Sequence, residues 1–210
     1  MLDFDGPICS IFARYPAPKV ARHLVSVLQA KDVGLPTTVV EETDPLEVLR
    51  WTGVNCPKAL VVAVEEALCA AERRAAEIAS PTPHGHDVIR AAWRSGVPTA
   101  IVSNNSAGAI TAYLVLHQLA ECVAAVIGRH FAEPSEMKPN PAPILSAVRA
   151  LKAEPNDCVL VGDSLSDIEG AAAAGVRAIG YANRPWKVTA FRAADVVVTS
   201  MSEVLEYLGT

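Results

Sequence analysis

From residue 84 onward, the sequence alternates between segments with helical periodicity and short apolar segments with the length of β-strands. Strands are predicted at 98–102, 123–127, 158–161, 177–181 and 195–198, with helices at 84–95, 107–119, 141–151, 166–174 and 201–208. Strands that alternate with helices are typical of parallel crossovers, with helices on both faces of an open sheet. We therefore expect an α/β fold with a doubly wound, mainly parallel, Rossmann-like sheet.

The segment before this alternation has a different pattern. Apolar residues recur at helical spacing and no strand-like alternation is present, which predicts three helices within residues 14–81. The Ser80-Pro81-Thr82-Pro83 run indicates a linker. We expect an α/β core formed by residues 1–13 and 82–210, with residues 14–81 inserted as a small helical unit.

Composition excludes several functional classes. The net charge is −5 and no Lys/Arg run is present, so we expect no nucleic-acid partner. The five cysteines are widely spaced without a C-x-x-C pair, which favours reduced thiols in a cytoplasmic protein. No signal peptide precedes the first motif and no apolar run reaches membrane-spanning length, so we also expect no membrane contact.

Polar side chains stand where several predicted strands end. Asp3 and Asp5 follow the first short strand, Ser103 and Asn104 follow the strand at 98–102, and Asp163 follows the strand at 158–161. Ligands of open parallel sheets bind at the carboxyl ends of the strands. These segments are therefore the first candidates for a site.

The Asp3-Phe4-Asp5-Gly6 segment holds two carboxylates two residues apart. On a strand, such residues point to the same face, so one carboxylate could act as a nucleophile and the other as a general acid and base. The alternative is an ordinary turn, because Asp-Gly is a common turn dipeptide.

Two further segments could hold an anion. The Ser103 hydroxyl and the backbone N–H groups after it could bind a phosphate oxygen, although this segment in isolation favours Ser or Asn as the N-cap of the next helix. Lys138, just before a Pro-started helix, could neutralise a phosphoryl group. Its alternative is a solvated loop lysine, which is the commoner fate of Lys.

Asp163 and Asp167 follow an apolar strand and are four residues apart. Carboxylates placed in this way suit Mg²⁺, which takes one or two carboxylates together with waters and substrate phosphate. The alternative interpretation makes Asp163 or Ser164 a helix cap and Asp167 a partner of the helix dipole.

The acid pair, hydroxyl, lysine and second acid pair occur in this order along the chain. In this respect the sequence resembles the haloacid dehalogenase-like hydrolase superfamily, in particular its phosphoglycolate phosphatase-like branch with a helical cap after the first strand. The resemblance implies that Asp3 forms an aspartyl-phosphate and that Asp5 is the acid and base. It also implies three sets of site residues. The catalytic residues would be Asp3, Asp5, Ser103 and Lys138, and the phosphate would be bound by Gly6, Ser103, Asn104 and Lys138. Mg²⁺ would be bound by Asp3, Asp5, Asp163 and Asp167.

Within that superfamily, Asp5 separates the reaction classes, because dehalogenases have no acid two residues after the nucleophile. The expected function is Mg²⁺-dependent hydrolysis of a small phosphorylated metabolite, with residues 14–81 as the cap. Two alternatives stay open: a sugar-phosphate phosphomutase of the same superfamily and a non-catalytic regulatory or binding module.

The sequence departs from the family pattern at two places. Pro7 stands where Thr or Val is more common, and the first strand is short, so it would lose hydrogen bonds beside Asp3.

Some other residues attract attention for their type. His84 and His86 form an H-x-H pattern, but we expect them at the linker and helix start rather than around zinc. Trp51 and Trp93 fit apolar helical faces and are expected in the core. Arg14 could face a substrate anion or lie exposed on the surface.

Overall fold

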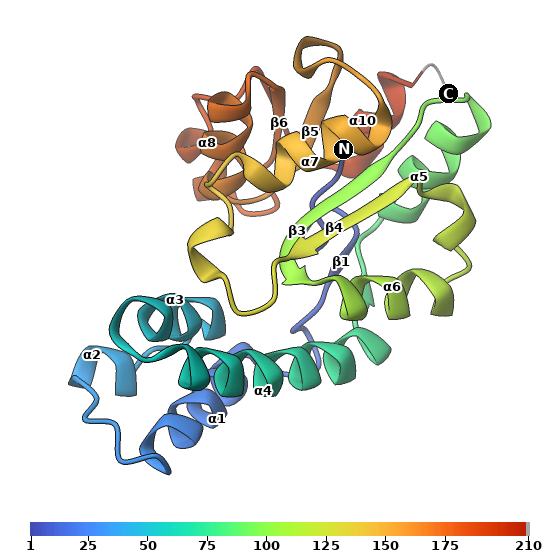
Figure 1. The fold of residues 1–210 in the computed structure, drawn as a ribbon. Coiled ribbons are helices and arrows are strands. Elements are labelled where there is room, and N and C mark those ends of the chain that lie inside the picture. The colour runs from blue at the N-terminus through green and yellow to red at the C-terminus, as the bar shows by residue number, and fades with distance from the viewer. Residues whose placement is uncertain (209–210) are drawn as a thin grey trace.

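The computed structural model describes residues 1–208 and contains one central parallel sheet (Figure 1). The Leu2 segment pairs in parallel with Ile101 on one side and Val161 on the other, so it joins the two halves of the sheet. The remaining strands are β3 (Ala100–Ser106), β4 (Ala125–Arg129), β5 (Val159–Gly162), β6 (Arg177–Tyr181) and β7 (Val196–Val198). The resulting order, β4-β3-Leu2-β5-β6-β7, confirms the predicted doubly wound α/β fold.

The first strand is short, yet its backbone groups are bonded on both sides. The Leu2 N–H donates to the Ala100 carbonyl (2.9 Å) and the Asp3 N–H donates to the Val161 carbonyl (2.8 Å). Val102 and Val161 donate in turn to the carbonyls of Leu2 and Met1. The expected loss of hydrogen bonds beside Asp3 is therefore not seen, because β3 and β5 both reach this segment.

Helices cover both faces of the sheet. One face packs against α5 (Gly85–Arg94), α6 (Ala107–Leu116) and α10 (Met201–Glu206), and the other against α7 (Ala142–Leu151) and α8 (Leu165–Ala174). Successive strand residues point to opposite faces, as Leu160 and Val161 do, and each joins a different hydrophobic cluster. The sheet therefore supports two cores, and its strand ends are left for polar residues.

The inserted helical unit has a third hydrophobic cluster. Its helices are α1 (Ala17–Gln29), α2 (Thr37–Val40), α3 (Pro45–Asn55) and α4 (Lys58–Glu77), and they lie together at one end of the molecule (Figure 1). Pro45 at the first helical position and an Asp44 side chain that accepts from the Leu46 N–H (2.8 Å) explain where α3 begins. The long helix α4 also packs against α6 of the core.

The chain leaves the core through β1 (Cys9–Ser10) and returns through β2 (Ser80–Pro81). These two segments pair antiparallel, with Cys9 opposite Pro81 and Ser10 opposite Ser80. The predicted linker at residues 80–83 is therefore partly a strand, a pairing that the sequence does not reveal because each strand has only two residues.

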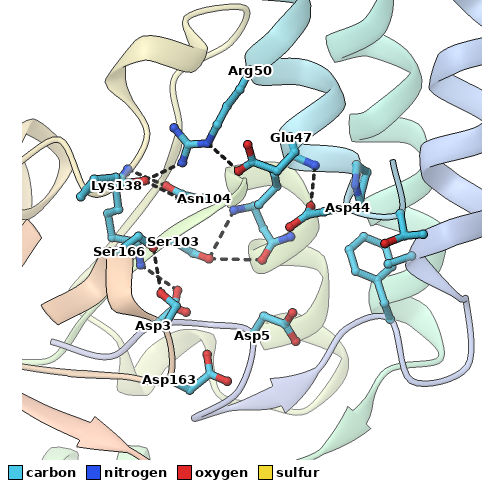
Figure 2. Close-up of a pocket in the computed structure, with 18 residues that line it drawn as sticks. Asp3, Asp5, Asp44, Glu47, Arg50, Ser103, Asn104, Lys138, Asp163 and Ser166 are labelled. Carbon is cyan, nitrogen blue, oxygen red and sulfur yellow. Dashed lines mark hydrogen bonds and ion pairs between the residues drawn. The ribbon is translucent and has the colours of Figure 1, made fainter. Parts of the chain in front are cut away.

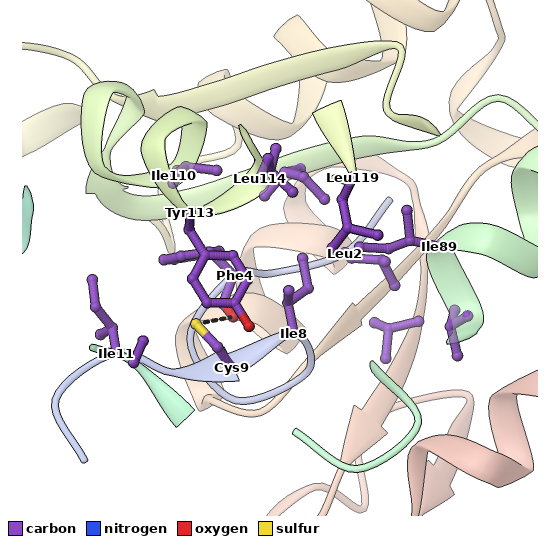
Figure 3. Close-up of a cluster of buried hydrophobic side chains, with 14 of the residues drawn as sticks. Leu2, Phe4, Ile8, Cys9, Ile11, Ile89, Ile110, Tyr113, Leu114 and Leu119 are labelled. Atoms are coloured by element: carbon purple, nitrogen blue, oxygen red, sulfur yellow. Dashed lines mark hydrogen bonds between the residues drawn. The ribbon is translucent and has the colours of Figure 1, made fainter. Parts of the chain in front are cut away.

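Phe4 lies inside the first core cluster, between the two predicted catalytic acids in sequence (Figure 3). Its side chain is fully buried, and its ring meets the Tyr113 ring edge-on at a centroid distance of 5.2 Å. Because the Phe4 side chain points into the core, the flanking Asp3 and Asp5 are left to face the end of the sheet.

Three other features refine the sequence prediction. Trp93 was expected in the core, but it is 57% exposed because it lies on the outer face of α5. Trp51 does pack against the helical cluster. The helices α2 (Thr37–Val40) and α9 (Pro185–Ala190) were not predicted, since four and six residues are too few for a periodic pattern, so residues 14–81 hold one helix more than the three expected. Within residues 1–208, no helix has both the length and the hydropathy needed to cross a bilayer.

Replacing Phe4 with Ala is expected to lower the free energy of unfolding by about 3–5 kcal/mol, because it leaves a cavity in the core. Trp93→Ala is the control and should change this free energy by about 1 kcal/mol or less, because that ring is mostly exposed. Urea unfolding monitored by circular dichroism measures both. Equal losses for the two variants would contradict the placement of Phe4.

Candidate active site

Most of the predicted site residues line one pocket of about 570 Å³ at the carboxyl ends of the strands, but Gly6 and Asp167 are not part of its lining (Figure 2). The core contributes the acids and the lysine, whereas the start of α3 contributes the opposite wall. The predicted residues in its lining are Asp3, Asp5, Ser103, Asn104, Lys138 and Asp163, and the charged residues from the helical side are Asp44, Glu47 and Arg50. Segments far apart in the chain therefore share one cleft.

Lys138 is the central cation of the pocket and is only 2% exposed. Its Nζ donates to Asp3 Oδ1 (2.9 Å), to Asp167 Oδ1 (2.5 Å) and to the Val102 carbonyl (2.7 Å). These three acceptors satisfy all three N–H groups of the ammonium. The alternative of a solvated loop lysine is therefore wrong.

Asp5 lies beside Asp3 in the lining of the pocket, and its Oδ1 accepts the Ile11 N–H (2.9 Å). Gly6 follows with φ +103°, a conformation that residues with a Cβ rarely adopt. A Cβ at Gly6 would also lie 2.2 Å from Cγ of Asp163. A glycine is therefore required here for both the turn and the close approach to Asp163.

Asp163 is held by two residues that sequence reasoning missed. Lys187 Nζ donates to Asp163 Oδ2 (2.6 Å) and to the Asp163 carbonyl (2.6 Å), and Asn183 Nδ2 donates to Asp163 Oδ2 (2.9 Å). Lys187 belongs to α9, a helix that was not predicted, so nothing in the sequence linked it to Asp163. This ion pair offsets one of the negative charges in the site.

Ser164 and Asp167 form a capping box at the start of α8. The Ser164 Oγ accepts the Asp167 N–H (3.2 Å), and Asp167 Oδ2 accepts both the Ser164 N–H (3.1 Å) and the Ser164 O–H (2.6 Å). The alternative interpretation of Ser164 as a cap is thus correct. Asp167 has both roles, because its other oxygen accepts from Lys138.

Ser103 and Asn104 lie within β3, where its register against β4 shifts between Val102 and Ser106, rather than at a helix cap. The N-cap of α6 is Ser106, so the capping alternative for these two residues is wrong. Ser103 lines the pocket and is 3% exposed. The Asn104 side chain accepts the Lys138 N–H (2.8 Å) and donates to the Lys138 carbonyl (3.1 Å), so it holds the lysine segment.

A group of three acids could hold a cation. One carboxylate oxygen each from Asp3, Asp163 and Asp167 lie within 4.8 Å of one another. Hard oxygen donors at this spacing are suited to Mg²⁺. The Asp5 side chain does not belong to this group, and the contact of its backbone carbonyl with a metal, which the family resemblance implies, stays a prediction.

The remaining candidates lie away from the pocket. His84 begins α5 and pairs with Asp87 (Nδ1 to Oδ2, 3.4 Å), while His86 Nε2 bonds to the Tyr113 hydroxyl (2.7 Å). Both histidines therefore stand at the linker and helix start, as expected. Arg14 is exposed and is not among the residues that line the pocket.

The sequence matches the family model described as haloacid dehalogenase-like hydrolase over residues 54–181, which is more than half of the chain. The chain belongs to this family. A phosphoglycolate phosphatase of Salmonella typhi is 31% identical over 129 residues, which cover 60% of this chain and 50% of that protein. A bifunctional riboflavin kinase/FMN phosphatase of Arabidopsis thaliana is 31% identical over 123 residues, which cover 58% of this chain and 32% of that protein. The chain thus spans half or less of these curated relatives.

A solved structure has the same fold. The putative phosphoglycolate phosphatase of Lactobacillus plantarum superposes with a TM-score of 0.69 at 17% identity, covering 98% of this chain and 96% of that one. At this identity the likeness concerns the fold, and it includes the inserted helices as well as the sheet, since nearly the whole chain is matched.

Burial dominates the electrostatics of this haloacid dehalogenase-like hydrolase. It raises the pKa of Asp3, and the Asp167 carboxylate adds to the rise, while the Lys138 ammonium opposes it. Burial also raises the pKa of Asp5 to about 7, although the hydrogen bond from Ile11 opposes this rise. Burial alone would lower the pKa of Lys138, but the Asp167 and Asp3 carboxylates together raise it, so this lysine stays charged.

The pKa of Asp5 predicts how stability depends on pH in the absence of divalent cations. Because the folded-state pKa is about 7 and the ordinary value is 3.8, the folded state binds a proton that the unfolded state lacks between these values. This contribution to stability therefore grows as pH falls from 7 to 4. Asp5→Asn should be more stable than the wild type by ~2 kcal/mol at pH 8, and the difference should narrow toward pH 4.

Urea unfolding in EDTA at several pH values measures this difference. Asp32→Asn is the matched control, because it makes the same chemical change at an exposed carboxyl and should alter the free energy by less than ~0.5 kcal/mol. If the wild type has a higher free energy of unfolding than Asp5→Asn at pH 8, burial does not destabilise the Asp5 carboxylate.

Proposed function

We propose that this protein is a Mg²⁺-dependent phosphatase that hydrolyses small phosphate monoesters through an aspartyl-phosphate on Asp3. The observation that carries the proposal is the Asp3 carboxylate, bonded to the buried Lys138 ammonium at 2.9 Å in a pocket that also holds Asp5. A nucleophile, a fixed positive charge and a second acid are the groups that phosphoryl transfer to a carboxylate needs. The phosphatases named among its relatives support the same reaction.

In the first step, an oxygen of the Asp3 carboxylate attacks phosphorus and the ester P–O bond breaks. The leaving oxygen takes the proton of Asp5, and an aspartyl-phosphate remains. In the second step, Asp5 removes a proton from water, whose oxygen attacks phosphorus and releases inorganic phosphate and the Asp3 carboxylate. A pKa near 7 allows Asp5 to give and take the proton at neutral pH.

The phosphoryl group would be held by the predicted phosphate set. Lys138 supplies the fixed charge, and Ser103 supplies a hydroxyl from the end of β3. Gly6 and Asn104 complete the predicted set, the first by permitting a tight turn beside Asp163 and the second by bonding the backbone of Lys138. Ser103, Asn104 and Lys138 share the pocket, whereas the role of Gly6 rests on its close approach to Asp163.

The donor chemistry of the acid group fits Mg²⁺, with Asp3 and Asp163 as side-chain ligands and with Asp167 and Asp5 as the other predicted contacts. Asp163 Oδ2 is bonded to Lys187 and Asn183, which leaves Oδ1 for a cation. Both oxygens of Asp167 already accept hydrogen bonds, so we infer that its main role is to hold Lys138. When bound, the cation would offset the repulsion between the carboxylates and a phosphate anion.

Residues 14–81 are proposed to act as the cap that covers the pocket. Their contribution to its wall comes mainly from the start of α3, where Arg50 donates to the Lys138 carbonyl (2.6 Å) and pairs with Glu47 (Nε to Oε1, 3.2 Å). A pocket of about 570 Å³ suits a small phosphorylated metabolite. Phosphoglycolate and nucleotides are candidate substrates by analogy with related folds.

The alternatives receive less support. A phosphomutase needs cap groups that hold a bisphosphate, and no Lys or His from residues 14–81 stands among the described residues that line the pocket. A non-catalytic module would not need two acids and a charged lysine brought together in one pocket. Hydrolysis is therefore the function that the geometry supports best.

Asp3→Asn is expected to reduce phosphatase kcat by at least ~1000-fold, because the amide cannot attack phosphorus. Asp32→Asn, the same change at an exposed residue of the helical unit, should retain wild-type turnover. Release of inorganic phosphate from a panel of monoesters measures both variants, with circular dichroism to confirm folding. Turnover retained in Asp3→Asn would refute this nucleophile.

Removal of divalent cations with EDTA should abolish phosphate release, and added Mg²⁺ should restore it, because the acids then lack the charge that offsets a phosphate anion. Each monoester in the panel is also followed by ³¹P NMR, which separates hydrolysis from isomerisation of a sugar phosphate. Isomerisation without phosphate release would favour the mutase. If neither hydrolysis nor isomerisation is seen, and beryllium fluoride does not bind in the presence of Mg²⁺, the result would favour the non-catalytic module.

A further inference from the structure

A buried ion-pair network lies behind the pocket, where α4 of the helical unit meets the ends of β3 and β4. Its members are Arg129 at the end of β4 and Glu65 and Glu72 on α4, with side chains that are at most 1% exposed. Arg129 Nη2 lies 2.7 Å from Glu65 Oε1, and Arg129 Nη1 lies 2.9 Å from Glu72 Oε1. The network therefore joins the helical unit to the sheet without contact with solvent.

The two glutamates have different neighbours although they share one guanidinium. Glu65 accepts hydrogen bonds from Nε and Nη2 of Arg129, and it also accepts one from the Cys69 thiol (3.2 Å). Glu72 accepts hydrogen bonds from Nη1 and Nη2 of Arg129. It also accepts hydrogen bonds from the Ser106 N–H (2.9 Å) and from Nδ2 of Asn105 (3.3 Å). Only Glu72 bonds directly to the end of β3.

The end of β3 is thus held at three successive residues. Arg129 Nη1 donates to the Asn104 carbonyl, and Glu72 accepts from Asn105 and Ser106. All of the nitrogen atoms of the guanidinium are engaged, which a lysine with a single ammonium could not reproduce. These residues directly follow Ser103, the proposed phosphate-binding hydroxyl.

The contacts continue from this loop into the pocket. Ser103 Oγ bonds to Asn105 Oδ1 (3.2 Å), and the Asn104 side chain makes two hydrogen bonds to the backbone of Lys138. Lys138 Nζ then reaches Asp3. A continuous set of hydrogen bonds therefore connects Glu72 on α4 with the carboxylate proposed as the nucleophile.

Stability alone does not account for such a network. Burying one cation with two anions carries a large desolvation penalty, and apolar residues of similar volume often give an equal or higher stability. The helix α4 otherwise buries apolar residues such as Leu68 and Ala75 on this side, so apolar side chains suit this interface. The hydrogen bonds to residues 104–106 are what an apolar replacement would remove.

We propose that Glu72 and Arg129 are positioning residues of the active site, which act through residues 104–106 to hold Ser103 and Lys138 in register with Asp3. Because Glu72 belongs to α4, the position of this helix and the geometry of the phosphate site are set by the same contacts. The inference rests on the proposed phosphatase function, and it assigns the Arg129 network a role beyond joining two parts of the fold.

The test compares Glu72→Gln with Glu65→Gln. Each variant removes one carboxylate from the same buried guanidinium, but only Glu72→Gln places an amide N–H₂ against the donor of either Asn105 or Ser106, which bond to different oxygens of Glu72. We expect Glu72→Gln to lower kcat/KM by about 100-fold, because a displacement of about 1 Å in a positioned group has an effect of this size. Its affinity for inorganic phosphate with Mg²⁺ should fall about 10-fold. Glu65→Gln should stay within about threefold of the wild type on both measures.

Two further variants separate positioning from folding. Asn105→Ala removes the Ser103 and Glu72 contacts of one loop side chain while Arg129 keeps both glutamates, so it should reproduce part of the loss with little change in Tm. Arg129→Lys retains the charge and should behave like Glu72→Gln. Because Asn105 itself lines the pocket, Arg129→Lys and Glu65→Gln form the decisive pair should Glu72→Gln fail to fold. The proposal would be overturned if the losses of kcat/KM and phosphate affinity simply followed the loss of Tm. It would also be overturned if these losses were equal for Glu65→Gln and for Glu72→Gln and Asn105→Ala.

The experiment also distinguishes this inference from the proposed function. A wild type without activity or phosphate binding would refute the function, and the positioning role is then judged from backbone amide NMR. Glu72→Gln should shift the amide resonances of Asn104 and Lys138, whereas Glu65→Gln should leave them near their wild-type positions. If the amide resonances of Asn104 and Lys138 do not shift in either variant, the inference is contradicted.

Discussion

The buried ammonium of Lys138 is the interaction on which the site depends. It lies between Asp3 and Asp167, and a charge so buried is tolerable only when opposite charges and hydrogen bonds compensate the lost hydration. The three residues come from the first strand, the loop before α7 and the first turn of α8. One lysine therefore joins Asp3, which is 135 positions away along the chain, to Asp167, which is 29 positions away on the other side.

Negative charge is concentrated at this end of the sheet. Four aspartates, Asp3, Asp5, Asp163 and Asp167, face two lysines, Lys138 and Lys187. The short loops after parallel strands bring these groups together because the strands end at one edge. An arrangement with more acids than bases is suited to a divalent cation and, through it, to an anion that the acids alone would repel.

The helical unit and the sheet meet at two kinds of contact. In the lining of the pocket, Arg50 of α3 donates to the backbone carbonyl of Lys138. Behind the pocket, Glu65 and Glu72 of α4 enclose Arg129. Ala132 and Met137, which precede Lys138 in the chain, also pack into the helical cluster. The lysine segment is thus contacted by the inserted helices from several sides, and its placement depends on both parts of the chain.

The sequence by itself determined the alternation of strands and helices, the inserted helical segment and the acids at the strand ends, because periodicity and strand termini are local properties of the chain. It also indicated Lys138, although for this segment alone a solvated lysine was the commoner alternative. Only the tertiary structure decided that Lys138 is buried, that Lys187 and Asn183 hold Asp163, and that Arg129 joins α4 to the end of β3. These pairs link residues between 20 and 135 positions apart, and each depends on side-chain geometry that no local pattern records.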